Sequence, residues 1–195
     1  MKLGLEELIA GLDKTYESQN THYTAPILYC LARLIARFPD SMKRGVGIAR
    51  DTLEIGTGLG FTSLFLASAA KDSGVKHWAI EPDLRNINSL KKMRDKYNFG
   101  GYFKILEGKS EEIEWPWKED KKFGLIYIDG LHTYEACLAD IKRYWKLVRE
   151  GGYLIIHDIN KKPVAKAVNE GYDSSKWERL MISYGPGLEI WRKRR

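Results

Sequence analysis

A glycine-rich segment near position 56 has residue types and spacing that suit ligand binding. Residues 53–55 have the apolar pattern of a buried strand and run directly into the turn Gly56-Thr57-Gly58. Glycine permits backbone conformations closed to other residues and lets a ligand press against the main chain. The helix that follows, from about Thr62, points its free N–H groups at any carboxylate or phosphate. The turn therefore predicts a site for a ligand that carries a negative or polar group.

An acid at the end of the next expected strand narrows the class of ligand. Glu81 follows the turn at a spacing of roughly 20 residues, where a carboxylate can accept both hydroxyls of a ribose. We therefore expect a nucleoside ligand, although Glu81 could instead cap the helix that starts near Pro82. A dinucleotide is disfavoured, because its fingerprint needs a glycine three residues after Gly58, where this chain has Phe61.

Four ionisable side chains follow two later strands: Asp129 and His132 after one, His157 and Asp158 after the other. An imidazole can take up a proton near neutral pH, since its unperturbed pKa is about 6.5. His132 is therefore our leading candidate for a base that removes a proton from a bound substrate. The alternatives are structural roles: His132 would stabilise its own loop, and His157 would hold the following loop by hydrogen bonds.

The elements that must position these residues alternate between short apolar runs and longer helical patterns. Strands are expected at residues 51–55, 76–81, 102–106, 124–129, 152–157, 178–184 and 188–194. Parallel neighbours need a crossover helix, so the pattern predicts an α/β fold, a Rossmann-like three-layer sandwich with a mostly parallel seven-stranded sheet. The last two strands are joined only by Gly185-Pro186-Gly187 and should form an antiparallel C-terminal hairpin. Helices are expected over residues 2–12 and 24–37.

Length and composition favour one globular domain. The 195 residues are 44% hydrophobic, and the apolar residues are spread along the chain. We expect a single domain over residues 1–195, with a helical N-terminal cap at 1–48 and the sheet core at 49–195. The apolar stretches are shorter than the ~20 residues that cross a bilayer, and the N-terminus lacks the pattern of a secretory signal. A cytoplasmic protein with no membrane association is expected.

The two cysteines fit a reducing compartment. Cys30 and Cys137 are far apart in helical patterns, with no Cys-x-x-Cys motif or histidine cluster beside them. We expect both to be small buried hydrophobic residues rather than metal ligands or nucleophiles.

Taken together, these segments resemble the class I S-adenosylmethionine-dependent methyltransferases, and among them the branch with catechol O-methyltransferase-like and sugar O-methyltransferases. The resemblance covers roughly residues 20–192. It rests on five ordered segments: Glu54-Ile55-Gly56-Thr57-Gly58 with Thr62, Ile80-Glu81, Gly108-Lys109-Ser110, Ile128-Asp129-Gly130-Leu131-His132-Thr133-Tyr134, and Gly151-Gly152-Tyr153-Leu154-Ile155-Ile156-His157-Asp158.

The resemblance implies a site for S-adenosylmethionine and assigns residues to it. The implied cofactor-binding residues are Glu54, Gly56, Thr57, Gly58, Thr62, Glu81, Ser110 and Asp129. The glycine turn would hold the methionine end of the cofactor, with the Thr62 hydroxyl on its carboxylate. Glu81 would hold the ribose and Ser110 would approach the adenine. Asp129 would lie beside the methionine amino group and the reacting sulfonium.

The resemblance also implies catalytic residues and leaves a metal site open. In catechol-type relatives a lysine base stands three places after the aspartate, and here that place is His132, so His132 and Asp129 are the expected catalytic pair. The same relatives bind Mg²⁺ through two aspartates, matching Asp129 and Asp158, and an asparagine directly after the second. This chain has Ile159 there and Asn160 one place later, so a divalent metal on Asp129 and Asp158 is a second possibility.

The expected reaction is methyl transfer to an oxygen of a small molecule such as a sugar or phenol. No Asn-Pro-Pro-Tyr motif for amine methylation follows the fourth strand. Two alternatives stay open. The formal net charge of +6, with basic clusters at 43–50, 161–162 and 192–195, would suit an RNA methyltransferase if the clusters formed one stripe. The incomplete metal pattern would suit a cofactor-binding module without catalysis.

Overall fold

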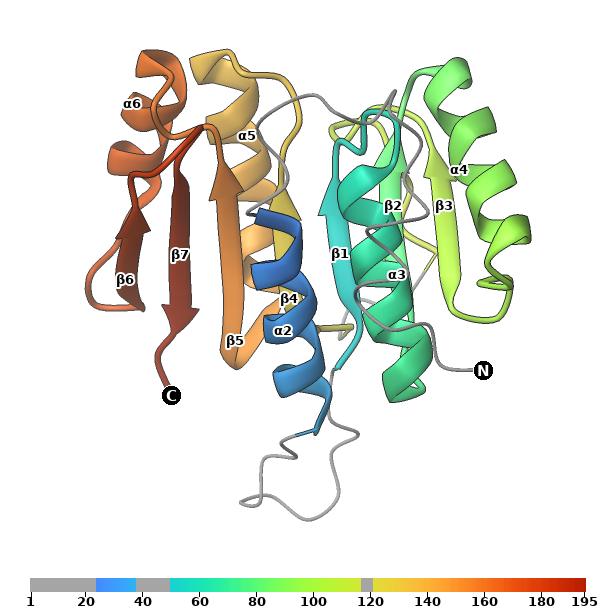
Figure 1. The fold of residues 1–195 in the computed structure, drawn as a ribbon. Helices are drawn as coiled ribbons and strands as arrows, with labels where there is room; N and C mark the ends of the chain where they lie inside the picture. Colours follow the sequence, from blue (N-terminus) through green and yellow to red (C-terminus); the bar gives the residue numbers. More distant parts are fainter. Residues whose placement is uncertain (1–23, 38–49, 117–120) are drawn as a thin grey trace.

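A seven-stranded sheet forms the centre of the protein in a computed structural model that describes residues 24–37, 50–116 and 121–195 (Figure 1). The strand order is β3-β2-β1-β4-β5-β7-β6. The strands are β1 (Thr52–Ile55), β2 (His77–Glu81), β3 (Phe103–Glu107), β4 (Phe123–Ile128), β5 (Val148–His157), β6 (Trp177–Ile182) and β7 (Leu188–Lys193). The first five run parallel, and β7 is antiparallel to both of its neighbours. The expected mostly parallel sheet with a C-terminal hairpin is confirmed.

Helices cover both faces of the sheet and complete the three layers seen in Figure 1. They are α2 (Thr24–Arg37), α3 (Phe61–Ser73), α4 (Leu84–Lys96), α5 (Tyr134–Tyr144), the short 3₁₀ helix η2 (Trp145–Leu147) and α6 (Lys162–Gly171). Apolar residues of α2 and α3 pack in one core cluster on one face, and those of α5 and α6 pack in a second cluster on the other. The central strands β1 and β4 are buried along their whole length, as expected of parallel strands covered on both faces.

Local signals fix where the helices begin and end. Asp83 caps α4 by accepting a hydrogen bond from the backbone N–H of Arg85 at 2.7 Å, and Thr133 caps α5 through Ala136 at 3.3 Å. Gly74 ends α3 in the left-handed conformation that glycine adopts without steric cost.

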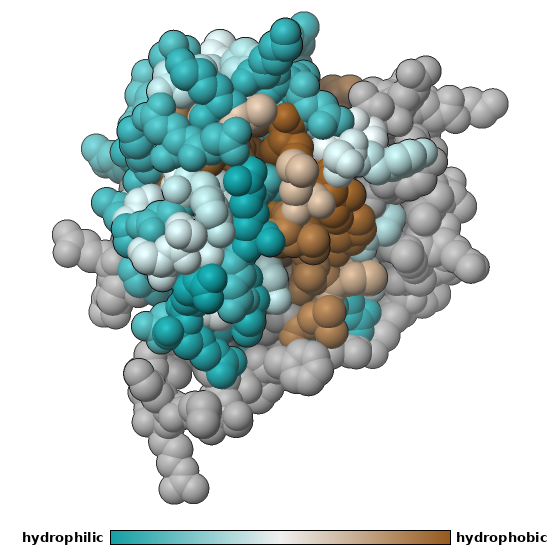
Figure 2. All heavy atoms as spheres, turned by 90° about the vertical axis from the view of Figure 1, so that its left-hand side faces the viewer, coloured by the Kyte–Doolittle hydropathy of each residue, from teal (hydrophilic) through white to brown (hydrophobic). Residues whose placement is uncertain are grey.

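The hairpin leaves one edge of the sheet open. The edge strand β6 exposes Leu180 and Met181, which point to opposite faces because side chains alternate along a strand. Figure 2 looks at the molecule from this side and shows apolar side chains gathered in one region among hydrophilic ones. The other expected features of the C-terminal hairpin, two strands and a short Gly-Pro-Gly turn, are all present.

The expectation that both cysteines are buried is wrong for Cys30. Cys137 is buried and burial raises the pKa of its thiol to about 12, but Cys30 is exposed. The reason is the orientation of α2, which turns Leu28, Tyr29 and Ala32 toward the core and leaves Cys30 facing solvent.

Some expectations concern residues outside the part of the chain that the structure describes. These are the helix at 2–12, most of the 1–48 cap and the basic residues at 43–49. No helix within that part is long and apolar enough to span a bilayer.

Candidate functional site

The glycine turn after β1 and the loop after β4 meet at the carboxyl edge of the sheet. The backbone N–H of Asp129 donates to the carbonyl of Ile55 at 2.8 Å. Gly56 has φ +78°, and a Cβ placed on it would lie 2.7 Å from Cα of Gly130. Gly58 also has positive φ, but a Cβ there would meet nothing within 4 Å. Gly56 is therefore required by close contact between two loops, whereas Gly58 leaves open space beside the turn.

Glu81 lies beside this turn, at the end of β2. Its Oε2 accepts hydrogen bonds from the backbone N–H of Thr57 at 3.0 Å and from the Thr57 hydroxyl at 2.8 Å. Its Oε1 accepts from the backbone N–H of Asp83 at 2.9 Å and from the Asn86 amide at 3.2 Å. These contacts fix the orientation of a carboxylate that is only 4% exposed. Glu81 and Thr57 thus form one unit at the end of β1 and β2.

Glu54 lies deeper than the rest of the expected cofactor site. Its carboxylate is fully buried, and Oε2 accepts from the Ser63 hydroxyl at 2.5 Å and contacts His77 Nε2 at 3.1 Å. Burial raises the pKa of Glu54, although the contact with His77 opposes that shift. The other oxygen, Oε1, has no hydrogen-bond partner. Glu54 therefore ties β1 to the first turns of α3 and to β2, beneath the turn.

Ser110 is half-buried, whereas Thr62 is buried. Ser110 follows β3, and its hydroxyl donates to Oδ1 of Asp140 on α5 at 2.6 Å. Burial raises the pKa of Asp140 to about 6, with the Ser110 bond acting in the opposite direction. Thr62 lies in the first turn of α3 and is only 3% exposed. The partner that Ser110 finds in Asp140 comes from a helix 30 residues further along the chain.

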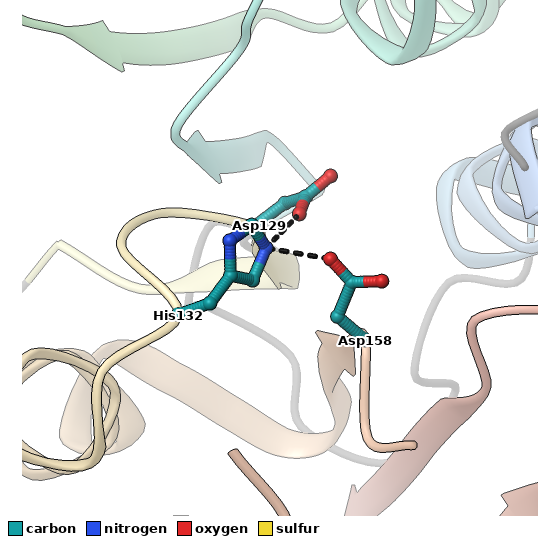
Figure 3. Close-up of side chains that lie close together, drawn as sticks. All are labelled: Asp129, His132 and Asp158. Carbon is teal, nitrogen blue, oxygen red and sulfur yellow. Dashed lines mark ion pairs between the residues drawn. The ribbon is translucent and has the colours of Figure 1, made fainter. Parts of the chain in front are cut away.

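Three ionisable side chains lie close together at the carboxyl edge of the sheet, those of Asp129, His132 and Asp158. Figure 3 shows the imidazole of His132 reaching between the two carboxylates, one from the end of β4 and the other from the end of β5. Nε2 of His132 lies 2.6 Å from Oδ2 of Asp158 and 3.4 Å from Oδ1 of Asp129. Asp158 has φ 58°, a left-handed conformation that is uncommon outside glycine and often occurs at functional sites.

Two further residues orient Asp129, and the sequence did not assign them to it. His157 is 5% exposed and its Nδ1 lies 3.2 Å from Oδ1 of Asp129, while the Tyr127 hydroxyl donates to Oδ2 at 3.2 Å. Burial alone would raise the pKa of Asp129, but the contacts with His132 and His157 outweigh it and lower that pKa. Burial alone would lower the pKa of His157, and the contacts with Asp129 and Asp158 outweigh it in turn. Asp129 is therefore held as a carboxylate.

The side chains of this cluster could hold a cation. Their ligand atoms match the oxygen pattern expected from the sequence only in part. Asp129, His132 and Asp158 each offer a ligand atom, and these atoms lie within 4.8 Å of one another. Asn160 does not join them, because its amide donates to the carbonyls of Gly185 at 2.5 Å and Ser183 at 3.3 Å. Nε2 of His132 is buried and makes no hydrogen bond of acceptable geometry, despite its closeness to both carboxylates. A buried nitrogen of this kind suits a ligand to a metal ion.

The sequence-predicted residues therefore fall into two groups. One group lies in loops or at strand ends at the carboxyl edge of the sheet and comprises Gly56, Thr57, Gly58, Glu81, Asp129, His132 and Asp158. The others lie apart from this group: Glu54 is buried beneath the turn, Thr62 is buried in the first turn of α3, and Ser110 is paired with Asp140 after β3. Lys161, expected from the sequence only as part of a basic cluster, places its Nζ 2.7 Å from Oδ2 of Asp158.

Comparison with known proteins identifies the same fold. A family model described as a methyltransferase domain matches residues 53–159, more than half of the chain. An O-methyltransferase from Bacillus cereus, solved in complex with SAH, is 17% identical with a TM-score of 0.70 over 97% of this chain and 90% of that chain. The O-methyltransferase TomG from Streptomyces achromogenes, solved with SAM, is 18% identical with a TM-score of 0.69 over 89% and 80%.

A relative with another kind of substrate shares the fold as well. An rRNA methylase from Streptococcus thermophilus is 13% identical with a TM-score of 0.65, over 92% of this chain and 99% of that chain. At these identities each likeness concerns the fold alone.

Proposed function

This chain belongs to the family described as a methyltransferase domain, and we propose that it transfers the methyl group of S-adenosylmethionine to an oxygen of a small molecule. The observation that carries the proposal is the shared edge of the sheet. There the Gly56 turn, Glu81 and Asp129 follow the carboxyl ends of β1, β2 and β4, where open α/β sheets bind their ligands. The Bacillus cereus and Streptomyces achromogenes structures were solved with SAH and SAM, which supports the same cofactor here.

We assign the ends of the cofactor to particular residues. The open space beside Gly58 would admit the methionine moiety against the backbone, near the N-terminus of α3. Glu81, already oriented by Thr57, would accept hydrogen bonds from the ribose hydroxyls. Ser110 would face the adenine, with Asp140 fixing its hydroxyl. Glu54 acts from below by holding α3 in place through Ser63.

Methyl transfer is a direct displacement. A lone pair of the acceptor oxygen forms the new bond to the methyl carbon, and the carbon–sulfur bond breaks with its electron pair moving to sulfur. The protein has to align the acceptor and promote loss of its proton. We propose that Asp129 and His132 together promote loss of the proton from the acceptor oxygen.

Cys137 cannot serve as a nucleophile for carbon methylation, because it is buried and its thiol pKa is raised to about 12.

A divalent cation belongs to this proposal. Asp129 and Asp158 supply two carboxylates on adjacent strands, and such a pair would hold Mg²⁺ or another dication. When bound, a dication lowers the pKa of an oxygen acid that coordinates it.

An RNA acceptor is less well supported by the described residues. Arg192 and Arg194 lie 3.1 and 3.7 Å from the carboxylate of Glu178, and Lys161 is paired with Asp158. These cations are partly neutralised by neighbouring acids, which weakens a stripe for phosphate backbone. We therefore place the acceptor among small hydroxyl compounds.

The proposal is tested by incubating the protein with isotopically labelled S-adenosylmethionine and a panel of catechols, phenols and sugars. Mass spectrometry should find a labelled methyl group on an acceptor oxygen together with S-adenosylhomocysteine. Asp129→Asn, which keeps the size of the side chain, should lose product formation. A label that appears only on added ribosomal RNA would favour the alternative acceptor, and no labelled product with any acceptor would contradict catalysis.

A further inference from the structure

The loop after β5 does not provide a third oxygen ligand for a metal ion. In the catechol-type pattern an asparagine directly follows the second aspartate, but here that place is Ile159, which is 8% exposed and packs in the second core cluster. Asn160 is used elsewhere, since its backbone N–H donates to Pro186 at 3.1 Å and its amide donates to Gly185 and Ser183. The loop is thus tied to the turn between β6 and β7.

His132 occupies the position that a third ligand would need. Its Nε2 lies near one oxygen of Asp129 and one of Asp158, at 3.4 and 2.6 Å. Ligand atoms around an ion with bonds of about 2.1 Å lie about 3.0–3.4 Å apart, so small adjustments would place all three on one ion. The N–H direction of Nε2 meets neither carboxylate in hydrogen-bond geometry, although the atom is buried. Figure 3 shows that Nε2 is the ring nitrogen that faces both carboxylates.

The two departures from the resembled pattern compensate each other. The catechol-type pattern has an asparagine directly after the second aspartate and a lysine at the place of His132, so this chain differs from that pattern by one oxygen donor less and one nitrogen donor more. Mg²⁺ prefers an all-oxygen shell, whereas imidazole suits zinc and other first-row transition ions. The charge also fits, because two carboxylates and a neutral imidazole neutralise a dication.

We propose that Asp129, His132 and Asp158 bind a divalent first-row transition ion, with Zn²⁺ held more tightly than Mn²⁺ and both more tightly than Mg²⁺. The inference rests on the proposed function and refines it: it names the ion class, and when an ion is bound His132 would act as its ligand rather than as a free base. Tyr127 and His157 support it by holding Asp129 from behind. Carboxylate ligands are commonly fixed by hydrogen bonds of this sort.

Lys161 provides a test with the opposite sign. Its ammonium group lies 2.7 Å from Oδ2 of Asp158, the oxygen that also lies nearest to His132. A cation at this oxygen competes with a metal ion for the same negative charge. Removal of the ammonium group should therefore strengthen metal binding, whereas removal of the imidazole should weaken it.

The experiment measures binding of Zn²⁺, Mn²⁺ and Mg²⁺ by calorimetry to the chelator-treated full chain. All proteins carry Cys30→Ser, because that exposed thiol could bind Zn²⁺ by itself. In this background His132→Ala should weaken Zn²⁺ binding at least about tenfold and change Mg²⁺ binding little, and Lys161→Ala should strengthen Zn²⁺ binding about two- to fivefold. Co²⁺ bound to the parent protein should show visible absorption bands that shift in His132→Ala.

Three outcomes would overturn the inference: no Zn²⁺ binding by the parent protein, Mg²⁺ binding as tight as Zn²⁺, or unchanged Zn²⁺ binding in His132→Ala. S-adenosylhomocysteine titration of the same variants separates this result from the proposed function, since His132→Ala should still bind it. Failure of metal selectivity with intact S-adenosylhomocysteine binding would refute the ion class alone. Absence of S-adenosylhomocysteine binding by the parent protein would refute the proposed function instead. The metal titrations would still test whether the three side chains bind the proposed class of ion.

Discussion

Asp140 offers a sharp test of the electrostatics around the expected adenine site. Its side chain is 4% exposed on α5 and accepts a 2.6 Å hydrogen bond from the Ser110 hydroxyl. Burial raises the pKa of Asp140 from 3.8 to about 6. Asp140→Asn removes the charge but keeps the size of the side chain and an oxygen that accepts from Ser110. The variant therefore isolates the cost of burying the carboxylate.

The direction of the pH effect follows from the raised pKa. Well below pH 3.8 the carboxyl is protonated in both states and contributes nothing. As the pH rises toward 6 the unfolded chain loses its proton first, so the folded state is progressively destabilised, and above pH 6 the cost is constant. A shift of about 2 pKa units corresponds to about 3 kcal/mol. Asp140→Asn should exceed the wild type in stability by about 1 kcal/mol at pH 4.5 and about 3 kcal/mol at pH 7.5.

Urea unfolding followed by tryptophan fluorescence at the two pH values measures this difference. Asp95→Asn, at an exposed acid on α4, serves as the control and should change stability by less than about 0.5 kcal/mol at either pH. An advantage of Asp140→Asn that does not grow between pH 4.5 and 7.5 would refute the reasoning, as would a variant less stable than the wild type at pH 7.5.

Two further perturbations test the turn and the core beneath it. Gly56→Ala should cost about 3 kcal/mol or more in urea unfolding, because its Cβ would collide with the backbone of Asp129, whereas Gly58→Ala should cost only the ~1–2 kcal/mol of left-handed backbone strain; equal losses would contradict the contact between the loops. His77→Leu should lower stability by about 3–5 kcal/mol, since it removes the imidazole that contacts the buried Glu54 carboxylate and leaves the Ser63 hydroxyl as its hydrogen-bond partner. A thermal unfolding midpoint close to that of the wild type would show that the contact between His77 and Glu54 contributes little.

Most of the fold could be predicted from the sequence because its signals are local. Buried parallel strands such as Phe123–Ile128 give continuous apolar runs, and the short Gly185-Pro186-Gly187 connection forces an antiparallel hairpin. The face of a helix that meets the core is not local in the same way. Cys30 has apolar neighbours on both sides in the sequence, and only the packing of α2 shows that it faces solvent.

The site was predictable where residues follow strand ends and unpredictable where partners come from distant elements. Asp129 and Asp158 meet because Ile128 and Ile156 are paired on adjacent parallel strands. The partnership of Asn160 with the β6–β7 turn depends on tertiary packing more than 20 residues away. His157 was expected to hold its own loop, but strand alternation places its ring on the same face as Tyr127, against Asp129. The signal that could have found it is this period-two pattern along β5.

The central claim, a site for S-adenosylmethionine at the carboxyl edge of the sheet, is tested most directly by calorimetric titration with S-adenosylmethionine and S-adenosylhomocysteine. Glu81→Ala should abolish binding of both, because it removes the proposed ribose contact. Glu107→Ala, at the end of the neighbouring strand β3, is the matched control and should bind both ligands like the wild type. Binding by the wild type and control but not by Glu81→Ala is the predicted result. Absence of binding by the wild type, or equal binding by all three proteins, would contradict the claim.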